Sequence, residues 1–284
     1  MSETRRFLSV SADITQGMTS SAARTQLFHA LHQPGPLALP NAWDVASALV
    51  VEAAGAKAVA TTSAGVAWSL GAADGDRLAR DRAVDLVARI VKAVEIPVSA
   101  DIETGFGDTA DDVAETVREI VHAGASGVNI EDGLGAGVRD IAEQKERYAA
   151  AREAGKDLYI NARIDTFLRQ VGDPADRIER TLERAAAFLE AGASGIFVPG
   201  VTDLETVTEL AKGIAAPLNL LVGPGAPAVD ELAKAGVARV SLGSAVAEAA
   251  YALAKRAAEE LLTLGTYSSV EGGIEYGELN ALFK

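Results

Sequence analysis

The sequence predicts a (β/α)8 barrel, because short β-like runs and Ala-rich amphipathic stretches alternate eight times along the chain. Four of the amphipathic stretches end in Ala-Gly, as in Glu190-Ala-Gly192, and glycine suits the left-handed residue that follows a helix. Eight such units in about 230 residues match a single barrel in length and count. A doubly wound sheet is the alternative, but it usually has fewer strands in one domain.

The expected elements follow one another without a long interruption. A short helix over 22–32 ends before Pro34-Gly35-Pro36, and the alternation begins there. Strands are expected over 37–43, 58–62, 97–103, 127–132, 158–165, 195–199, 218–222 and 239–242. Helices are expected over 45–54, 81–94, 111–123, 141–154, 176–191, 204–214, 228–235 and 244–264.

Three parts of the chain are expected from this pattern. Residues 1–21 are rich in Ser and Thr, lack periodicity, and are predicted to be a flexible N-terminal segment. Residues 22–266 form the barrel. Residues 267–284 are left over and are expected to cap the barrel or to pack on a neighbouring subunit.

The composition excludes several classes of protein. The chain has 284 residues and no cysteine, so disulfides, a thiol nucleophile and Cys-ligated metals are ruled out. With 26 Lys and Arg against 40 Asp and Glu, its net charge of −14 argues against nucleic acid or an anionic membrane as partner. No apolar run reaches the roughly 18 residues that span a bilayer. No signal peptide is recognised, and we expect a cytoplasmic protein.

Acidic residues stand where the predicted strands end, which is where barrel enzymes carry their active sites. The third strand leads into Asp101 and Glu103, and the fourth reaches Glu131. Asp101 and Glu103 are two residues apart and therefore point to the same side of the strand. Such carboxylates repel one another unless a cation lies between them, and ligands that are all oxygen favour Mg²⁺, with Mn²⁺ possible in its place.

Other charged residues near these strand ends have more than one interpretation. Arg163, at the end of the fifth strand, could pair with Glu131 or Asp165, or it could grip a substrate carboxylate with two hydrogen bonds. An acidic residue at a strand end often caps the next helix, and we expect this of Asp108 and Asp140.

Three motifs in this order resemble the isocitrate lyase/phosphoenolpyruvate mutase superfamily. They are Asp101-Ile-Glu-Thr-Gly-Phe-Gly107, Asn129-Ile-Glu-Asp132 and Asn161-Ala-Arg163, and the likeness extends over residues 39–243. The resemblance implies a Mg²⁺-dependent enzyme that forms or cleaves C–C or P–C bonds through a pyruvate-like enolate. It also implies a homotetramer or homodimer in which the last helix packs on a neighbouring barrel.

The resemblance assigns roles to individual residues. Asp101 matches the main metal ligand, while Glu103, Glu131 and Asp74 match carboxylates that hold the metal mostly through water. Arg163 matches the arginine that engages the substrate, which is expected to be a 2-oxo acid. The same substrate would also bind the metal at Asp101. Arg163 and Glu131 are the expected catalytic residues. The turn expected to hold the substrate carboxylate consists of Thr62, Ser63 and Ala64.

The sequence departs from the family where the proton donor is expected. The loop 132–140 contains none of the Cys, His or Lys of the lyase branch and no Asn of the mutase branch, and Phe197-Val-Pro-Gly200 lacks that branch's histidine. A reaction that needs only an enolate stabiliser, with protonation by solvent, is therefore expected. We predict a lyase or decarboxylase acting on a small 2-oxo or 2-hydroxy dicarboxylate; the alternatives are a phosphonopyruvate-type mutase or hydrolase and a non-catalytic 2-oxo acid binder.

Overall fold

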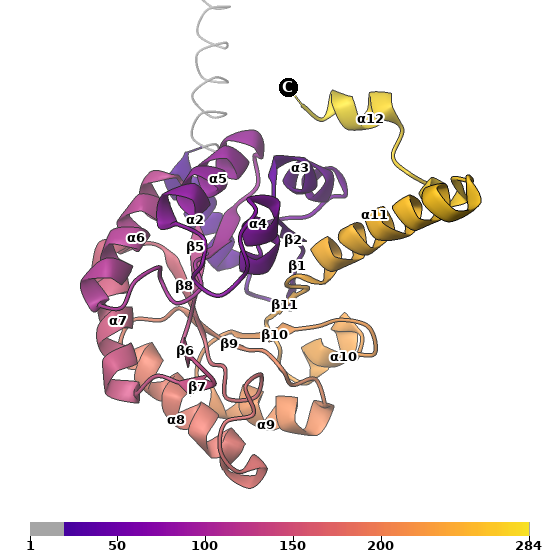
Figure 1. Ribbon diagram of the computed structural model, residues 1–284. Coiled ribbons are helices and arrows are strands. Elements are labelled where there is room, and N and C mark those ends of the chain that lie inside the picture. The colour runs from indigo at the N-terminus through magenta and orange to yellow at the C-terminus, as the bar shows by residue number, and fades with distance from the viewer. Residues whose placement is uncertain (1–19, 284) are drawn as a thin grey trace, which may run out of the picture.

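The computed structural model describes residues 20–283, which form a parallel β-barrel surrounded by helices (Figure 1). Nine strands lie in the order β1-β11-β10-β9-β8-β5-β4-β3-β2, and every pairing in this sheet is parallel. The predicted barrel is thereby confirmed. The flexible segment expected over 1–21 lies almost entirely outside the described residues.

Every predicted strand is present, and each lies within its expected range. Buried aliphatic side chains such as Val128, Ile130 and Ile160 fill the strands, so the sheet is covered on both faces. The strands are β1 (Leu37–Leu39), β2 (Asn41–Ala42), β3 (Val59–Thr61), β4 (Val98–Asp101), β5 (Gly127–Glu131), β8 (Tyr159–Arg163), β9 (Gly195–Val198), β10 (Leu218–Leu221) and β11 (Arg239–Ser241).

The first predicted strand is divided in two at Pro40, and this division closes the barrel. Proline has no N–H to donate to a neighbouring strand. Before it, β1 pairs with β11; after it, β2 pairs with β3. The Asn41 side chain spans the division, since its amide oxygen accepts the N–H of Leu242 at 2.9 Å and of Gly243 at 2.8 Å. Its amide nitrogen donates to the Thr61 carbonyl at 3.1 Å, so a single side chain joins the first and last strands to β3.

The predicted helices are also present, each within two residues of its expected bounds. Asp140 caps its helix as predicted, accepting the N–H of Ala142 at 2.8 Å. The prediction for Asp108 was wrong, because Thr109 caps the next helix in a reciprocal box with Asp112. The helices are α2 (Ser21–Ala30), α3 (Val45–Ala53), α5 (Arg80–Ala93), α6 (Ala110–His122), α7 (Ile141–Ala154), α8 (Arg177–Glu190, after the short helix η1 at Pro174–Asp176), α9 (Leu204–Gly213), α10 (Val229–Lys234) and α11 (Ala245–Leu264).

Some elements were not predicted. A short helix α4 (Ser63–Ser69) follows β3, and a hairpin of β6 (Gly133–Leu134) and β7 (Gly137–Val138) follows β5. The segment 267–284, which was expected to be a C-terminal tail or helix, contains the short helices η2 (Ser268–Val270) and α12 (Tyr276–Ala281), and Figure 1 shows α11 and α12 extending away from the barrel. No helix among the described residues is long and apolar enough to cross a membrane.

A buried histidine lies at the N-terminal end of the strands, far from the mouth. His32 is 2% exposed and stacks on the ring of Tyr159, the first residue of β8, with centroids 4.0 Å apart. Its Nδ1 lies 2.8 Å from the Phe28 carbonyl oxygen. Burial and the positive charges of Arg239 and His29 lower the pKa of His32 to about 4. The folded protein therefore keeps this imidazole neutral.

We expect His32 to make stability depend on pH. Between its unfolded pKa near 6.5 and its folded pKa of about 4, the unfolded chain binds the extra proton. Stability is therefore lost as pH falls through this window, by about 2 to 3 kcal/mol from this residue. Denaturant unfolding at pH 7 and pH 4.5 should show a smaller pH effect in His32→Gln than in wild type. The exposed His122→Gln is the control, and an equal pH effect in His32→Gln would contradict the prediction.

Candidate active site

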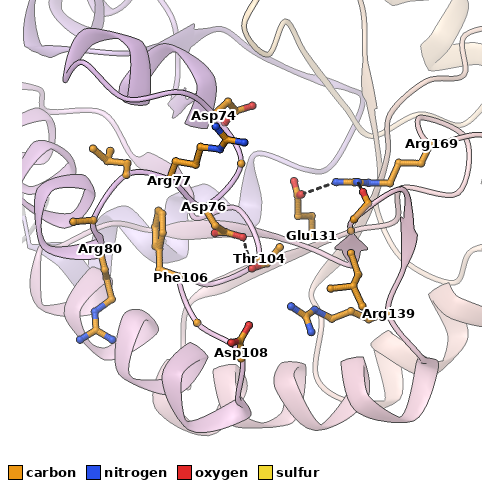
Figure 2. A pocket seen from close by; sticks show the side chains of 17 residues that line it. Asp74, Asp76, Arg77, Arg80, Thr104, Phe106, Asp108, Glu131, Arg139 and Arg169 are labelled. Carbon is orange, nitrogen blue, oxygen red and sulfur yellow. Dashed lines mark hydrogen bonds and ion pairs between the residues drawn. The ribbon is translucent and has the colours of Figure 1, made fainter.

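A cavity of about 770 Å³ opens at the C-terminal ends of the strands (Figure 2). Its walls come from the loop 74–80, from the segment 104–108 after β4, and from the tip of the β6–β7 hairpin. Glu131, Arg139 and Arg169 also reach it. The cavity thus lies where the barrel was predicted to carry its active site.

The strand β4 ends at Asp101, the predicted main metal ligand. The backbone N–H of Asp101 donates to Oγ1 of Thr61 at 2.9 Å, which ties the strand end to β3. From the residues that the structure describes, its carboxylate accepts only two long hydrogen bonds, from the N–H of Glu103 at 3.3 Å and of Ser63 at 3.4 Å. Both oxygens therefore retain unused capacity to bind a positive group.

Glu103 turns back toward the same region through an unusual backbone conformation. Its φ of +53° is in the left-handed region, and so is the φ of +55° at Asp76. The two residues meet, because the Asp76 N–H donates to the Glu103 carboxylate. The Asp76 carboxylate in turn accepts the hydroxyl of Thr104 at 2.6 Å. The loop that carries Asp74 is thereby fastened to the end of β4.

Burial and neighbouring carboxylates raise the pKa values of Asp101 and Glu103. Burial raises the pKa of Asp101, against the opposing charge of Arg163, and Asp74 adds to the increase. Burial raises the pKa of Glu103 to about 8; the Asp76 N–H opposes this, while the charges of Asp76, Asp74 and Asp101 add to it. Within the part of the chain that the structure describes, no lysine or arginine forms an ion pair with Asp101 or Glu103. Neither carboxyl therefore has a cationic partner of its own among the described residues.

Arg163 and Glu131 face each other across neighbouring strands, as their pairing in the β5–β8 register requires. Nη1 of Arg163 lies 2.7 Å from Oε2 of Glu131. The opposite edge of the guanidinium contacts Asp165, with Nε 2.7 Å from Oδ1 and Nη2 3.2 Å from Oδ2. Burial lowers the pKa of Arg163, but the carboxylates of Glu131 and Asp165 outweigh it and raise the pKa overall. Both ion pairs considered for Arg163 are present.

A second arginine, not singled out from the sequence, completes a closed set of charges. Nη2 of Arg169 lies 3.3 Å from Oε1 of Glu131, and its Nε lies 2.9 Å from Oδ2 of Asp165. Arg163, Glu131, Arg169 and Asp165 thus form a ring of alternating charge. Figure 2 shows Arg169 directed at Glu131 from across the cavity mouth. The only sequence signal was the four-residue spacing of Asp165 and Arg169, which is common on any helical turn.

A buried ion pair next to this ring of charges holds the adjoining backbone in place. Asp132 is fully buried, and its Oδ2 lies 2.6 Å from Nε of Arg184 on α8. Its other oxygen accepts the backbone N–H of Asp165 at 2.9 Å. Arg184 also donates to the Arg139 carbonyl at 2.6 Å. Asp132, the residue after β5, is therefore structural, and it fixes the backbone that holds Asp165 next to Arg163.

The structure brings some of the predicted metal-site residues together and separates others. Asp101, Glu103 and Asp74 share one electrostatic environment. Glu131 instead has both oxygens in ion pairs with arginines. Among residues 20–283, no three acidic or histidine side chains form a complete metal site by themselves. The expected convergence of Asp101, Glu103 and Glu131 is therefore absent, and the roles of these residues toward a metal stay predictions.

The donor set nevertheless fits a hard cation. Mg²⁺ commonly takes one or two carboxylates and completes its shell with water or substrate oxygens. Asp101 suits that role, because its oxygens accept weak hydrogen bonds and pair with no cation in the described part of the chain, and Asp74 and Glu103 could act through water. Thr62 and Ala64 are buried at the start of α4, and the N–H of Ser63 faces Asp101. Their binding of a substrate carboxylate also stays a prediction.

Fold and site together define an enzyme of the barrel class that carries its reactive groups at the carboxyl ends of the strands. The family model described as phosphoenolpyruvate phosphomutase matches residues 28–262. The chain belongs to this family, which confirms the resemblance drawn from the motifs at Asp101, Asn129 and Asn161.

Individual relatives agree with this assignment. An uncharacterized protein of Mycobacterium tuberculosis (strain ATCC 25618 / H37Rv) is 38% identical over 89% of this chain and 95% of its own length. The 2-methylisocitrate lyase of Escherichia coli (strain K12) is 31% identical over 74% of each chain. The crystal structure of 2,3-dimethylmalate lyase, a member of the PEP mutase/isocitrate lyase superfamily, is 26% identical with a TM-score of 0.80, covering 93% of this chain and 94% of that one.

Proposed function

We propose that the chain is a divalent-cation-dependent lyase or decarboxylase that cleaves a C–C bond in a small 2-oxo or 2-hydroxy dicarboxylate. The observation that carries this proposal is the uncompensated group of Asp101, Glu103 and Asp74 beside the fixed guanidinium of Arg163. Such an arrangement suits a cation and an anionic substrate bound together. Two relatives named as lyases support the reaction class.

Several residues of the chain would take part in the reaction, each with a different role. Asp101, with Asp74, Glu103 and Glu131 mostly through water, would hold Mg²⁺ or Mn²⁺, which supplies a Lewis acid for the keto oxygen. Asp165 holds one edge of Arg163, so the Nη1 edge that now contacts Glu131 is the part that can turn to the substrate. There it would stabilise the negative charge of the developing enolate.

Protonation of the product falls to solvent in this proposal. The residues that line the cavity include no Cys, His, Lys or Tyr. Tyr159 lies at the opposite end of β8, packed against His32. Decarboxylation tolerates this arrangement, because an enolate released into a hydrated cavity can take its proton from water. In retro-aldol cleavage the proton of the substrate hydroxyl would pass to water, and water would protonate the enolate.

Assembly into a homotetramer or homodimer is also proposed. The C-terminal part of the chain exposes large apolar side chains, including Leu262 at 84%, Tyr267 at 76% and Tyr276 at 84%. Figure 1 shows α11 and α12 standing away from the barrel. Packing of this arm on the barrel of a second copy would bury these groups.

A substrate panel tests the proposed function. Purified protein is assayed with 2-oxo and 2-hydroxy dicarboxylates and Mg²⁺, following release of pyruvate and CO₂. We expect at least one substrate to turn over, with activity lost in chelator and restored by Mg²⁺ or Mn²⁺. Full turnover in chelator would contradict the metal role. Phosphate release or isomerisation with phosphonopyruvate would favour the P–C alternative, and oxalate binding without turnover of any substrate would favour a non-catalytic binder.

A further inference from the structure

Arg169 joins three parts of the cavity mouth. It follows β8 in the chain, contacts Glu131 at the end of β5, and donates from Nη1 to the carbonyl of Gly135 at the tip of the β6–β7 hairpin. Its Nε contacts Asp165, which holds Arg163. The hairpin itself has only two paired positions, Gly133 with Val138 and Leu134 with Gly137. Few bonds of its own therefore hold it in place.

The sequence of the hairpin provides room for this arginine. A Cβ added to Gly133 would lie 2.7 Å from Cζ and 2.8 Å from Nε of Arg169. The guanidinium thus lies directly across the glycine, where any side chain would displace it. A Cβ added to Gly137, on the other strand of the hairpin, would have only the Leu134 carbonyl within 4 Å, at 3.9 Å. A side chain at position 133 would therefore displace the Arg169 guanidinium, whereas a side chain at position 137 would not.

We propose that Arg169 is a positioning residue that fastens the hairpin 133–138 to the Glu131–Arg163 pair. It also keeps Glu131 paired when Arg163 turns to a substrate carboxylate, and this second role rests on the proposed function. Glu131 now shares its two oxygens between the two arginines. Without Arg169, release of Arg163 would leave a largely buried carboxylate with no cation, which is costly. Arg169 thereby lowers the cost of substrate binding without contacting the substrate.

Hydrogen exchange of the hairpin amides tests the fastening directly and needs no substrate. Peptides covering 133–138 should exchange faster in Arg169→Met and, because the guanidinium is displaced, in Gly133→Ala. Gly137→Ala is the matched control and should exchange like wild type. Circular dichroism and thermal melts establish that each variant is folded. Unchanged exchange in both Arg169→Met and Gly133→Ala would overturn the fastening.

Oxalate, titrated calorimetrically in the presence of Mg²⁺, tests the second role. We expect Arg169→Met to weaken oxalate binding by about tenfold to 100-fold, the usual cost of losing a partner that orients a site residue. Once a substrate is known, KM should rise more than kcat falls. Arg169→Lys keeps a charge for Glu131 but cannot bridge three acceptors. It should retain most oxalate affinity while the hairpin still exchanges fast.

The outcomes separate this inference from the proposed function. Faster hairpin exchange with unchanged oxalate affinity in Arg169→Met would overturn the positioning role and leave the fastening supported. If wild-type protein binds no oxalate and turns over no substrate, the proposed function and the positioning role both fail. The exchange experiment then still decides whether Arg169 fastens the hairpin.

Discussion

Arg163→Lys is expected to lower kcat/KM by about 100-fold to 1,000-fold, the range seen when one donor to a developing oxyanion is removed. Arg163 uses separate edges of its guanidinium for Asp165 and Glu131, at 2.7 Å in each case. A lysine ammonium is a single point of charge and cannot hold Asp165 with two bonds while also contacting Glu131. The positive charge is kept, so the loss measures geometry rather than charge alone.

Steady-state kinetics with the best substrate of the panel checks this expectation. Arg89→Lys is the matched control, because Arg89 pairs with Asp85 on the exposed face of α5 at 2.7 Å. Exposed pairs of this kind contribute at most about 1 kcal/mol to stability, so the control should behave like wild type. If Arg163→Lys lost no more activity than Arg89→Lys, Arg163 would be a structural ion-pair partner only.

Asp101→Asn is expected to abolish cation-dependent turnover while leaving the barrel folded. The change is isosteric and removes one carboxylate with which no lysine or arginine among residues 20–283 forms an ion pair. Loss of the metal removes several kcal/mol of stabilisation of the transition state, or about 1,000-fold in kcat. Melting in the absence of metal should be unchanged or occur at a higher temperature, because an unpaired, partly buried charge is gone.

Metal affinity is the direct measurement for Asp101. Mn²⁺ titration followed by electron paramagnetic resonance should show binding by wild type that weakens by at least about 100-fold in Asp101→Asn, more than the loss of an outer partner produces. Asp111→Asn, on the exposed first turn of α6, is the control for removal of a carboxylate. Equal Mn²⁺ affinity in wild type and Asp101→Asn would place the cation elsewhere and remove Asp101 from the mechanism.

Periodicity predicted the barrel closely because strands and helices in it are local and repetitive. Each strand of the barrel is a short apolar run, and the helix bounds follow from where amphipathic stretches start and stop. The carboxyl ends of parallel strands necessarily meet, so Asp101, Glu131 and Arg163 could be placed at one mouth without coordinates. The resemblance to the family rested on those same strand ends.

The remaining parts of the site depend on contacts between loops, which periodicity does not encode. Asp76 and Glu103 meet through two left-handed backbone positions that neither residue type requires. Arg169 folds back over Gly133, and the sequence shows a loop cation without showing which carboxylate it meets. For the same reason the pairing of Glu131 with Arg163 could be considered from the sequence, whereas its pairing with a second arginine, Arg169, could not.

The division at Pro40 has a consequence for how the chain is made. β1 can pair with β11 only after β11 has been synthesised, and the Asn41 side chain accepts the N–H of Gly243, which lies 202 positions later. During synthesis, Arg163 and all of the acidic residues at the mouth are therefore made before the barrel can close. Until then both borders of the nascent sheet are open, and such borders are where growing chains join each other. Pairing of β1 with β11, and with it closure of the sheet, is possible only after residues 239–243 have been made.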